Sequence, residues 1–559
     1  MAAQHISGNE PRVVAVPSDN LGSSTSKPTD EIFEVDKQDK MASPESPKER
    51  ELRASPPGNV VIKHLRENPY VLGLAAFASL GGMLFGYDQG VVSGILTMQN
   101  FGAKFPRIYM DATFKGWFTS TLLLAAWLGS LVNGPIADRI GRKGSIFLAV
   151  GIFTLGSALQ AGAESIPMLF TEFGTQYIGG IKCSPDIPLS GGTIKNPTFD
   201  PYNDVGPGGC DGQSEASWRL PLAIQIIPAL ILGIGMLFYP ESPRFYCMHK
   251  QEDKALRALS IIRQADIESP ALCREFLAIK AEVLFEESYA RDHYPGKTGV
   301  ALYAAQYASL FSTVPSLKRI IIGCTIMFFQ QFMGCNAIIY YAPTIFEQLG
   351  LSSRTTSLLA TGVYGIVNTL STLPALFLID RVGRRPLLMA GALGTFISLV
   401  IVAGMVGGFD GDNVAAGWVG IAFVYIYDIN FSYSFAPIGW VLPAEIFNLG
   451  NRAKAMSITT SATWMCNFII GLVTPDMLAR LGWGTYLFFA AFCLLALGFT
   501  YFFVPETKGR SLEDMDRVFG DVAAHQEKKR LFDIAAELGI VELDSVKSGK
   551  VGKVDVEEA

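Results

Sequence analysis

The chain has 559 residues, of which 49% are hydrophobic and 17% are charged, and its formal net charge is −6. Soluble globular proteins average about 25% charged residues, and their cores are built from much shorter apolar segments than those found here. The composition therefore excludes an ordinary soluble protein and predicts an integral membrane protein.

The first segment, residues 1–66, is rich in Ser, Pro, Lys and Glu. Such a segment cannot bury enough apolar surface to fold by itself. We expect a disordered cytosolic tail over these residues, without a cleavable signal peptide.

Ten apolar runs of at least 20 residues follow this tail. Each can cross a hydrocarbon layer about 30 Å thick as a helix that rises about 1.5 Å per residue. Polar and apolar residues do not alternate, so a transmembrane β-barrel is excluded. The run 413–444 is interrupted only by Asp428. The nine runs without any charge are 68–87, 116–137, 144–163, 220–240, 320–346, 355–379, 386–409, 455–475 and 481–505.

The runs predict an all-α membrane protein with two half-bundles and ten transmembrane helices. The N-terminal half, 67–240, has four helices and an extracytoplasmic loop at 164–217, and the C-terminal half, 320–505, has six helices. Between the halves, residues 241–319 combine charges with apolar residues at helical spacing, which predicts a cytosolic linker of amphipathic helices. A second cytosolic tail follows at 506–559.

Basic residues lie in alternate loops. They follow the second, sixth, eighth and last runs and are frequent in 241–319, whereas 164–217 has only Lys182 and Lys195. The positive-inside rule then places both termini and the linker in the cytosol. We expect a multi-pass protein of the plasma membrane.

Two cysteines, Cys183 and Cys210, share the long polar loop. No Cys-x-x-Cys pair occurs, and four other cysteines lie inside apolar runs, so a metal cluster is not expected. If the loop is extracytoplasmic, the two cysteines can form a disulfide, and two unpaired thiols are the equally simple alternative.

Short charged sequences recur at matching places in the two halves. The second run ends with Asp138-Arg139-Ile140-Gly141-Arg142-Lys143, and the sixth ends with Asp380-Arg381-Val382-Gly383-Arg384-Arg385. The two groups of helices close with Pro240-Glu241-Ser242-Pro243-Arg244 and Pro505-Glu506-Thr507-Lys508-Gly509. A tight turn favours Gly and Arg in any protein, but four such turns in matching order indicate duplicated halves. Such halves are typical of transporters that rock around a site near the membrane midplane.

Three further motifs complete a family pattern. They are Phe85-Gly86-Tyr87-Asp88, Gln330-Gln331-Phe332-Met333-Gly334-Cys335-Asn336 followed by Tyr340-Tyr341, and Ala436-Pro437-Ile438-Gly439-Trp440. Together with the four turns, they resemble the sugar-porter family of the Major Facilitator Superfamily, most like its fungal hexose transporters, over residues 65–517. The resemblance implies a transporter without cofactor, metal or nucleic-acid partner. The absence of a phosphate-binding loop and of a nucleophile elbow from the sequence also argues against an enzyme.

The chain departs from the twelve helices of this family. After the third run, the sequence passes from Gln160 to a segment, 171–180, that looks like the one following the family's fifth helix. We therefore expect helices four and five to be absent, together with the family's Arg on helix four and its sugar-binding Gln on helix five. Loss of an even number of helices keeps the loops on their proper sides, but it should leave the N-terminal half loosely packed.

Amide side chains point to a sugar site. Sugar hydroxyls both donate and accept hydrogen bonds, so their site needs amides and an aromatic face. Hydrogen bonding between helices is the alternative use of buried amides, and a Trp is also ordinary at a membrane interface. The resemblance carries the family's sugar contacts onto Gln330, Gln331, Asn336, Tyr340, Asn368 and Trp440.

Asp88 is the clearest candidate for a proton-binding residue, because it follows 20 uncharged residues. A carboxylate at such a place can bind and release a proton. In the family's proton-coupled members the matching Asp is the protonation site, held by the helix-four Arg expected to be absent here. Proton symport is the first interpretation and facilitated diffusion the alternative. Asp428 can likewise bind a proton or substrate, or only form a hydrogen bond inside the bundle.

Charged residues of the four turns, with one further Glu, have a mechanical role in the family. Ion pairs among them can lock the inner gate in the outward-open state, and breaking these pairs shifts the rocking equilibrium. The expected pairs are Arg139 or Arg142 with Glu241, and Arg381 or Arg384 with Glu445 and Glu506. Each charge alone can also serve as a topology signal. The expected gate residues are Asp138, Arg139, Arg142, Glu241, Arg244, Asp380, Arg381, Arg384, Glu445 and Glu506.

The sequence therefore predicts a secondary transporter that moves a monosaccharide, first of all a hexose, through the lipid bilayer by alternating access. The alternative is a protein that does not transport, either a sugar sensor or a shortened, transport-defective form. Pentoses, hexoses and polyols use the same amides, so the sequence leaves the sugar open.

Overall fold

The computed structural model describes residues 69–161, 183–184, 186–192, 197–207, 209–350, 354–408, 414–448, 452–510, 512–520 and 523–539. The predicted disordered tail, 1–66, lies outside the described residues. So does segment 162–182, where the sequence departs from the family pattern.

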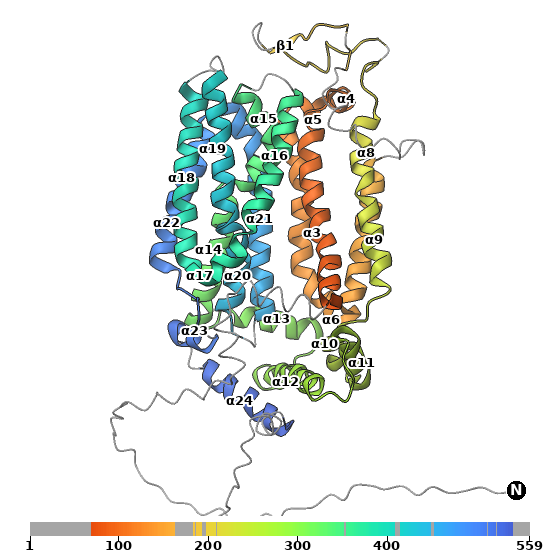
Figure 1. Cartoon of the computed structure of the whole chain (residues 1–559), viewed down its shortest axis with the longest axis vertical. Helices are drawn as coiled ribbons and strands as arrows, with labels where there is room; N and C mark the ends of the chain where they lie inside the picture. The colour runs from red at the N-terminus through yellow and green to blue at the C-terminus, as the bar shows by residue number, and fades with distance from the viewer. Residues whose placement is uncertain are drawn as a thin grey trace, which may run out of the picture. The chain divides into compact units, whose positions relative to one another are not determined.

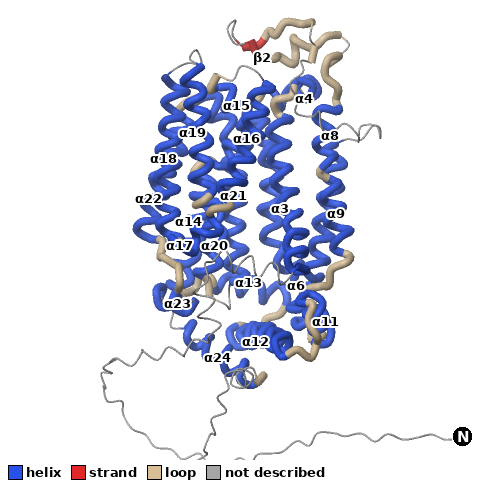
Figure 2. The backbone as a smooth tube through the Cα atoms, in the orientation of Figure 1, coloured by secondary structure: helices blue, strands red, loops and turns tan. Residues whose placement is uncertain are grey.

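Long helices make up most of the described chain (Figures 1 and 2). The N-terminal half consists of α3 (Pro69–Ile95), α4 (Gln99–Lys104), α5 (Pro106–Met110), α6 (Ala112–Ala161), α8 (Ala216–Ile224) and α9 (Ile226–Met236). The linker consists of α10 (Pro243–Met248), α11 (Glu252–Arg263), α12 (Pro270–His293) and α13 (Gly299–Ser309). The C-terminal half consists of α14 (Val314–Phe332), α15 (Cys335–Gln348), α16 (Arg354–Thr372), α17 (Ala375–Val382), α18 (Arg384–Gly408), α19 (Val414–Ser432), α20 (Phe435–Ile446), α21 (Arg452–Arg480) and α22 (Gly484–Phe503).

Short elements complete the described chain. Strands β1 (Gly191–Gly192) and β2 (Pro197–Thr198) pair antiparallel in the loop before α8. Helices α23 (Leu512–Phe519) and α24 (Ala523–Glu537) follow the C-terminal half, within the segment predicted as a cytosolic tail. Figure 1 shows the linker helices and α24 at one end of the bundle, called the linker end, and the β1 loop at the opposite end, called the loop end.

The predicted helical membrane bundle is confirmed. Among the described residues, eight continuous helical stretches are long and apolar enough to cross a membrane. One of them, α6, contains two predicted runs, which Gly141 separates into arms 112–140 and 142–161 because its φ of 83° and ψ of 166° are not helical. The total of ten spans stays a prediction, since 162–182 is not described.

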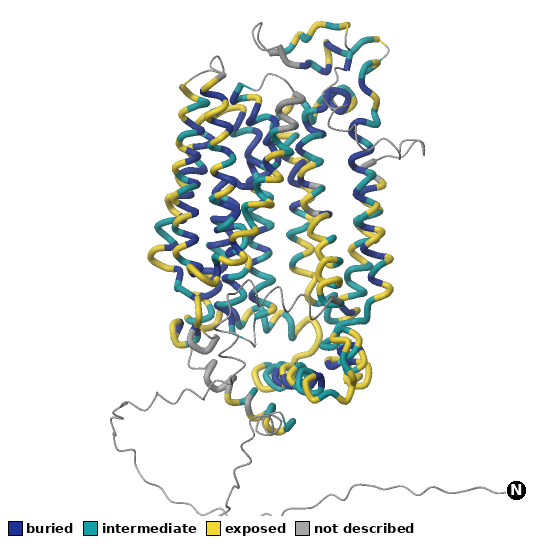
Figure 3. The backbone as a smooth tube through the Cα atoms, viewed as in Figure 1, coloured by how far each residue is buried: buried dark blue, intermediate teal, exposed yellow. Residues whose placement is uncertain are grey.

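The two halves meet mainly through α6 and α21, with α3 against α15. Near the loop end, the Trp117 ring of α6 meets the Phe468 ring of α21 edge-on, with centroids 5.9 Å apart. Farther along the same pair of helices, Ser457 Oγ donates to the Ser130 carbonyl at 3.0 Å. Buried residues concentrate in the C-terminal half, whereas exposed positions recur along α3, α6 and α9 (Figure 3).

The loop before α8 is pinned to α4. Cys183 and Cys210 form a disulfide in the structure. The sequence alone allowed either this disulfide or two unpaired thiols. Gln99 accepts from the Cys183 backbone N–H at 2.6 Å, and the Asn100 amide donates to the Gln213 carbonyl at 2.6 Å. These buried bonds hold the loop against α4 at the loop end of the bundle.

Helices α10 to α13 lie within residues 241–319, where the sequence predicts amphipathic helices. The apolar sides of α10, α11 and α12 form a small separate core that includes Leu259, Leu272, Phe276 and Val283. Because these helices bury their own apolar faces, the linker forms a compact layer under the bundle.

Candidate functional site

The turn between the two arms of α6 is built from Gly141 and Glu241. Gly141 has a positive φ of 83°, and a Cβ there would collide with the Glu241 carboxylate. This carboxylate accepts the backbone N–H groups of Arg142 at 3.1 Å and Lys143 at 3.0 Å. The negative charge thus caps unpaired amides at the start of the second arm, where the helix dipole also favours it.

The C-terminal half repeats this turn with Gly383 and Glu506. Gly383 has φ 106°, and Glu506 accepts the backbone N–H groups of Arg384 at 3.0 Å and Arg385 at 3.1 Å. Burial alone would raise the pKa of Glu506, but backbone hydrogen bonds, from Lys508 first, outweigh it and hold the pKa below its ordinary value. The repeated sequences therefore form the same capped turn in each half.

Arg384 adds side-chain ion pairs to the second turn. Its guanidinium lies 2.6 Å from Glu445 Oε1 and 3.2 Å from Asp380 Oδ1, and Thr507 donates to Glu445 Oε2 at 2.6 Å. A bidentate contact of this kind fixes orientation as well as charge. A pocket of about 430 Å³ opens beside these groups. It is lined by Asp380, Arg384, Glu445, Thr507, Lys508, Gly509, Arg510 and Met515.

Other expected gate residues have different partners. Asp138 accepts a hydrogen bond from Tyr303 of α13 at 2.9 Å. Burial, followed by this hydrogen bond, raises the pKa of Tyr303 to about 12, so the phenol stays a donor at neutral pH. Arg244 pairs with Glu282 at 3.2 Å and also with Glu286.

Two expected side-chain pairs are not formed in the described structure. Neither Arg139 nor Arg142 makes an ion pair with Glu241, which instead takes backbone amides. Arg381 contributes its backbone carbonyl to the Lys508 ammonium. The sequence located the charged residues of the turns, but it did not show that Glu241 and Glu506 would take backbone amides as partners.

The predicted sugar residues begin at a break between α14 and α15. Gly334 adopts φ 95°, and the carbonyl of Met333 beside it accepts from the buried Tyr427 hydroxyl at 3.0 Å. Gln330, in the last turn of α14, donates from Nε2 to the Phe435 carbonyl at 3.0 Å. Gln330 Oε1 is buried without a hydrogen-bond partner. An interrupted helix with an unused buried acceptor is a place where a ligand hydroxyl can bind.

Gln331 and Asn336 face each other across this break. Asn336 Nδ2 donates to Gln331 Oε1 at 2.6 Å. Both side chains carry further donor and acceptor positions, and Gln331 is nearly buried. The pair joins two of the predicted sugar contacts directly.

Gln330, Gln331 and Asn336 are called the amide row. Tyr340, next along α15, contacts residues of both halves. Its hydroxyl accepts from Gln89 Nε2 of α3 at 3.1 Å and lies 3.3 Å from Asn467 Nδ2 of α21. Gln89 and Asn467 were missed in the sequence, although each is a polar residue within or just beyond an apolar run. Each of them lies more than 100 positions from Tyr340 in the sequence, and only the packing of the helices brings them together.

Asn368 belongs to a neighbouring cluster in α16 and α19. Its Nδ2 donates to Asp428 Oδ1 at 2.8 Å and to Ser432 Oγ at 3.0 Å. Asp428 is fully buried. Trp440 on α20 is 41% exposed and takes no part in these hydrogen bonds. The Asp88 side chain lies outside the described residues.

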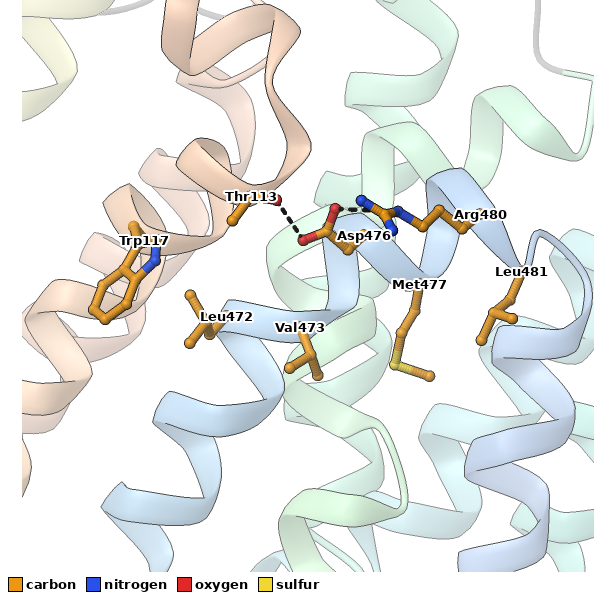
Figure 4. Close-up of a pocket in the computed structure, with 8 residues that line it drawn as sticks. All are labelled: Thr113, Trp117, Leu472, Val473, Asp476, Met477, Arg480 and Leu481. Carbon is orange, nitrogen blue, oxygen red and sulfur yellow. Dashed lines mark hydrogen bonds and ion pairs between the residues drawn. The ribbon is translucent and has the colours of Figure 1, made fainter.

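A further pocket of about 450 Å³ lies between the first arm of α6 and the loop end of α21 (Figure 4). Thr113 Oγ1 donates to Asp476 Oδ2 at 2.8 Å, and Asp476 also pairs with Arg480 at 3.8 Å. None of the six predicted sugar residues lines this pocket. Its polar contact joins the two halves, and neither Thr113 nor Asp476 is among the site residues predicted from the sequence.

A bundle of two half-domains, repeated capped turns and buried amides at a broken helix defines a secondary transporter. The model of the family "Sugar (and other) transporter" matches residues 74–184 and 204–519. The chain belongs to this family, within the Major Facilitator Superfamily, and it is not an enzyme.

Individual proteins show the same likeness. The major facilitator superfamily transporter mfsA of Aspergillus fumigatus is 31% identical, over 84% of this chain and 89% of that protein. A probable glucose transporter, rco-3, of Neurospora crassa is 30% identical, over 79% of this chain and 78% of that protein. The proton:xylose symporter XylE shares the fold with a TM-score of 0.58 and 23% identity, over 81% of this chain and 100% of that one.

Proposed function

We propose that this chain carries a monosaccharide, first of all a hexose, across the plasma membrane by alternating access, with both termini and the linker in the cytosol. The proposal is supported by the family match and by the likeness to a probable glucose transporter and a xylose symporter. It rests on one observation above all. The break between α14 and α15 gathers buried amide groups, one of which keeps an unused acceptor.

Sugar binding would exchange internal hydrogen bonds for bonds to the ligand. Gln330 Oε1 accepts one hydroxyl, and the amides of Gln331 and Asn336 open toward others when their mutual bond is given up. Tyr340 contributes its hydroxyl, which already contacts Gln89 and Asn467. Because these groups sit in a low-dielectric interior, a ligand that leaves one unpaired binds poorly.

Rocking of the halves would act on contacts that flank this row. The Thr113–Asp476 bond is at the loop end, and Tyr340–Gln89 joins the halves beside the amides. At the linker end, the Arg384–Glu445 pair and the capped Glu241 and Glu506 turns would stiffen each half so that it moves as a body. Proton symport is the proposed mode, with Asp88 as the candidate carrier of the proton.

The test is uptake of labelled glucose by a hexose-transport-deficient host that expresses this 559-residue chain at its surface. We expect saturable uptake that falls in the presence of a proton uncoupler. Gln331→Ala should reduce uptake about 3- to 15-fold, the effect of one lost hydrogen bond. Gln348→Ala is the matched control, because this amide is in the last turn of α15 and contacts Tyr486, away from Gln331 and Asn336.

Three results would change the proposal. Uptake that survives the uncoupler would replace symport by facilitated diffusion. Glucose binding without uptake, from a chain present at the surface, would favour a sensor. Neither binding nor uptake of any monosaccharide would contradict the proposed function.

A further inference from the structure

We infer that Asp428 is a proton-binding group. When it is ionised, it holds the side-chain amide N–H of Asn368 in a hydrogen bond, and when it is protonated, that N–H becomes available to a sugar hydroxyl. The inference rests on the proposed function, since it takes Asn368 as a sugar contact. It assigns a coupling role within the C-terminal half, separate from Asp88 in α3.

Asp428 lies about one turn before the C-terminal end of α19, without a basic partner in the described part of the chain. Its side chain is completely buried, and Oδ1 accepts from Asn368 Nδ2 at 2.8 Å and lies 3.5 Å from Ser432 Oγ. Oδ2 has no hydrogen bond of standard geometry, although the Tyr364 hydroxyl is close enough to interact with the carboxylate. A buried carboxylate with so few partners is costly to keep ionised.

The groups around Asp428 are neutral at physiological pH. Helix α19 packs against α15, α16, α18 and α20. From α16 the carboxylate faces Tyr364, from α15 it faces Cys335, and on its own helix Tyr427 is adjacent. The ionisable residues of α18 and α20 are at the first turn of α18 and the last turn of α20. They are Arg384, Arg385 and Glu445.

Asn368 has no amide hydrogen left for a ligand in this arrangement. Its Nδ2 carries two hydrogens, and these go to Asp428 Oδ1 and Ser432 Oγ. The bond to an ionised carboxylate is the stronger of the two, since charge-assisted hydrogen bonds are about twice as strong as neutral ones. While Asp428 is ionised, a sugar hydroxyl must compete with that bond.

Protonation changes this competition. When Asp428 takes up a proton, its oxygen becomes a weaker acceptor and the acid gains an O–H donor that can serve Ser432. The Asn368 amide then turns at lower cost toward a sugar hydroxyl. Because linkage is reciprocal, bound sugar would in turn favour the protonated acid. The two events are thereby coupled through one shared hydrogen bond.

The experiment measures equilibrium binding of labelled glucose to the purified full chain between pH 5.5 and pH 8. We expect affinity to fall with rising pH by about 5- to 150-fold, the usual range of coupling between two sites. Asp428→Asn, which resembles the protonated acid, should bind at high pH about as well as the parent chain binds at low pH. Asp533→Asn on exposed α24 is the matched control and should keep the parent pH dependence.

A second variant guards against misfolding of Asp428→Asn. Ser432→Ala keeps the acid but removes a donor to its ionised form, so the midpoint of the pH dependence should move to higher pH. An unchanged pH dependence in Asp428→Asn, or in Ser432→Ala, would overturn the inference and leave the proposed function standing. Absence of glucose binding by the parent chain at every pH would contradict the proposed function itself, and the inference with it.

Discussion

The two halves of this transporter differ in how much of their helix surface is covered by protein. In the most apolar window of α3, 6% of residues are buried, and in that of α6 the share is 11%. The stretch of α8 and α9 in the same half reaches 44%, and the shares in the C-terminal half run from 17% for residues 360–382 to 67% for the stretch containing α14 and α15. Lipid can cover apolar side chains, so exposure alone does not destabilise a membrane helix. The difference concerns packing and polar contacts between helices.

This contrast separates two tasks. The C-terminal half holds the amide row, the Asp428 cluster and most of the buried aromatic residues, so it forms a rigid support for a site. The N-terminal half has one small core around Leu84, Ala229, Leu232 and Met236. It depends in addition on α21, on α15 and on the disulfide-bonded loop. Sparse packing of the N-terminal half is what the absence of two family helices from this half would produce.

The largest predicted effect concerns a buried ion pair of the C-terminal half. Arg319 is 1% exposed, and its guanidinium lies 2.6 Å from Asp516 of α23 and over the Phe519 ring. Asp516→Asn should lower the free energy of unfolding by about 3 kcal/mol, because it removes the charge that faces a buried guanidinium. Chemical unfolding in mixed micelles would measure this.

The matching pair of the N-terminal half provides the control. Lys104 and Glu215 lie 2.9 Å apart, with side chains 48% and 37% exposed. Lys104→Gln should cost at most about 1 kcal/mol, as solvent screens the pair. Equal losses for the two variants would contradict the proposed difference in packing.

A smaller difference is expected for core truncations. Leu388 on α18 is fully buried within the large core, and Leu84 on α3 belongs to the small core. Leu388→Ala should cost about 2–4 kcal/mol, and the loss for Leu84→Ala should be at least about 1 kcal/mol smaller, because a loose site collapses more easily around a cavity. The comparison uses the same unfolding assay. A larger loss at Leu84 would show that the N-terminal half is packed as tightly as its partner.

The smallest effect is the acid sensitivity of the Glu506 turn. The pKa of Glu506 is lowered in the folded chain, so its contribution is present above the ordinary Glu value of about 4.3 and is lost as the pH falls through and below that value. Glu506→Gln should therefore cost about 1 kcal/mol at neutral pH, after allowance for solvent, and progressively less on acidification.

Melting curves of the two chains between pH 3.5 and pH 7 measure this convergence. Glu287→Gln, an exposed acid of α12, is the control and should follow the parent curve. A constant gap between Glu506→Gln and the parent chain over the whole range would show that the capped turn does not depend on the charge of Glu506.

Much of this architecture could be predicted from the sequence. Helix length, charge-free runs and the repeated Gly turns depend on local chemistry, and Gly141 and Gly383 both have the positive φ that such turns require. The partners of the site residues could not be predicted. Gln89 meets Tyr340, and Asn368 meets Asp428, only because the helices pack in one particular rotation.

Local patterns also failed for groups that use the backbone as partner. Glu241 and Glu506 were expected to pair with arginine side chains, yet they cap helix starts. Charge identity in a sequence does not distinguish a guanidinium partner from an amide one, because both are donors within reach of the same turn.

The most direct test of the account is the affinity of the purified chain for labelled glucose, with and without the amide row. We expect saturable binding that Asn336→Ala weakens about 3- to 15-fold, while Gln348→Ala on the same helix leaves it unchanged. Equal affinity in all three chains would show that sugar binds elsewhere and would contradict the assignment of the α14–α15 break as the sugar site.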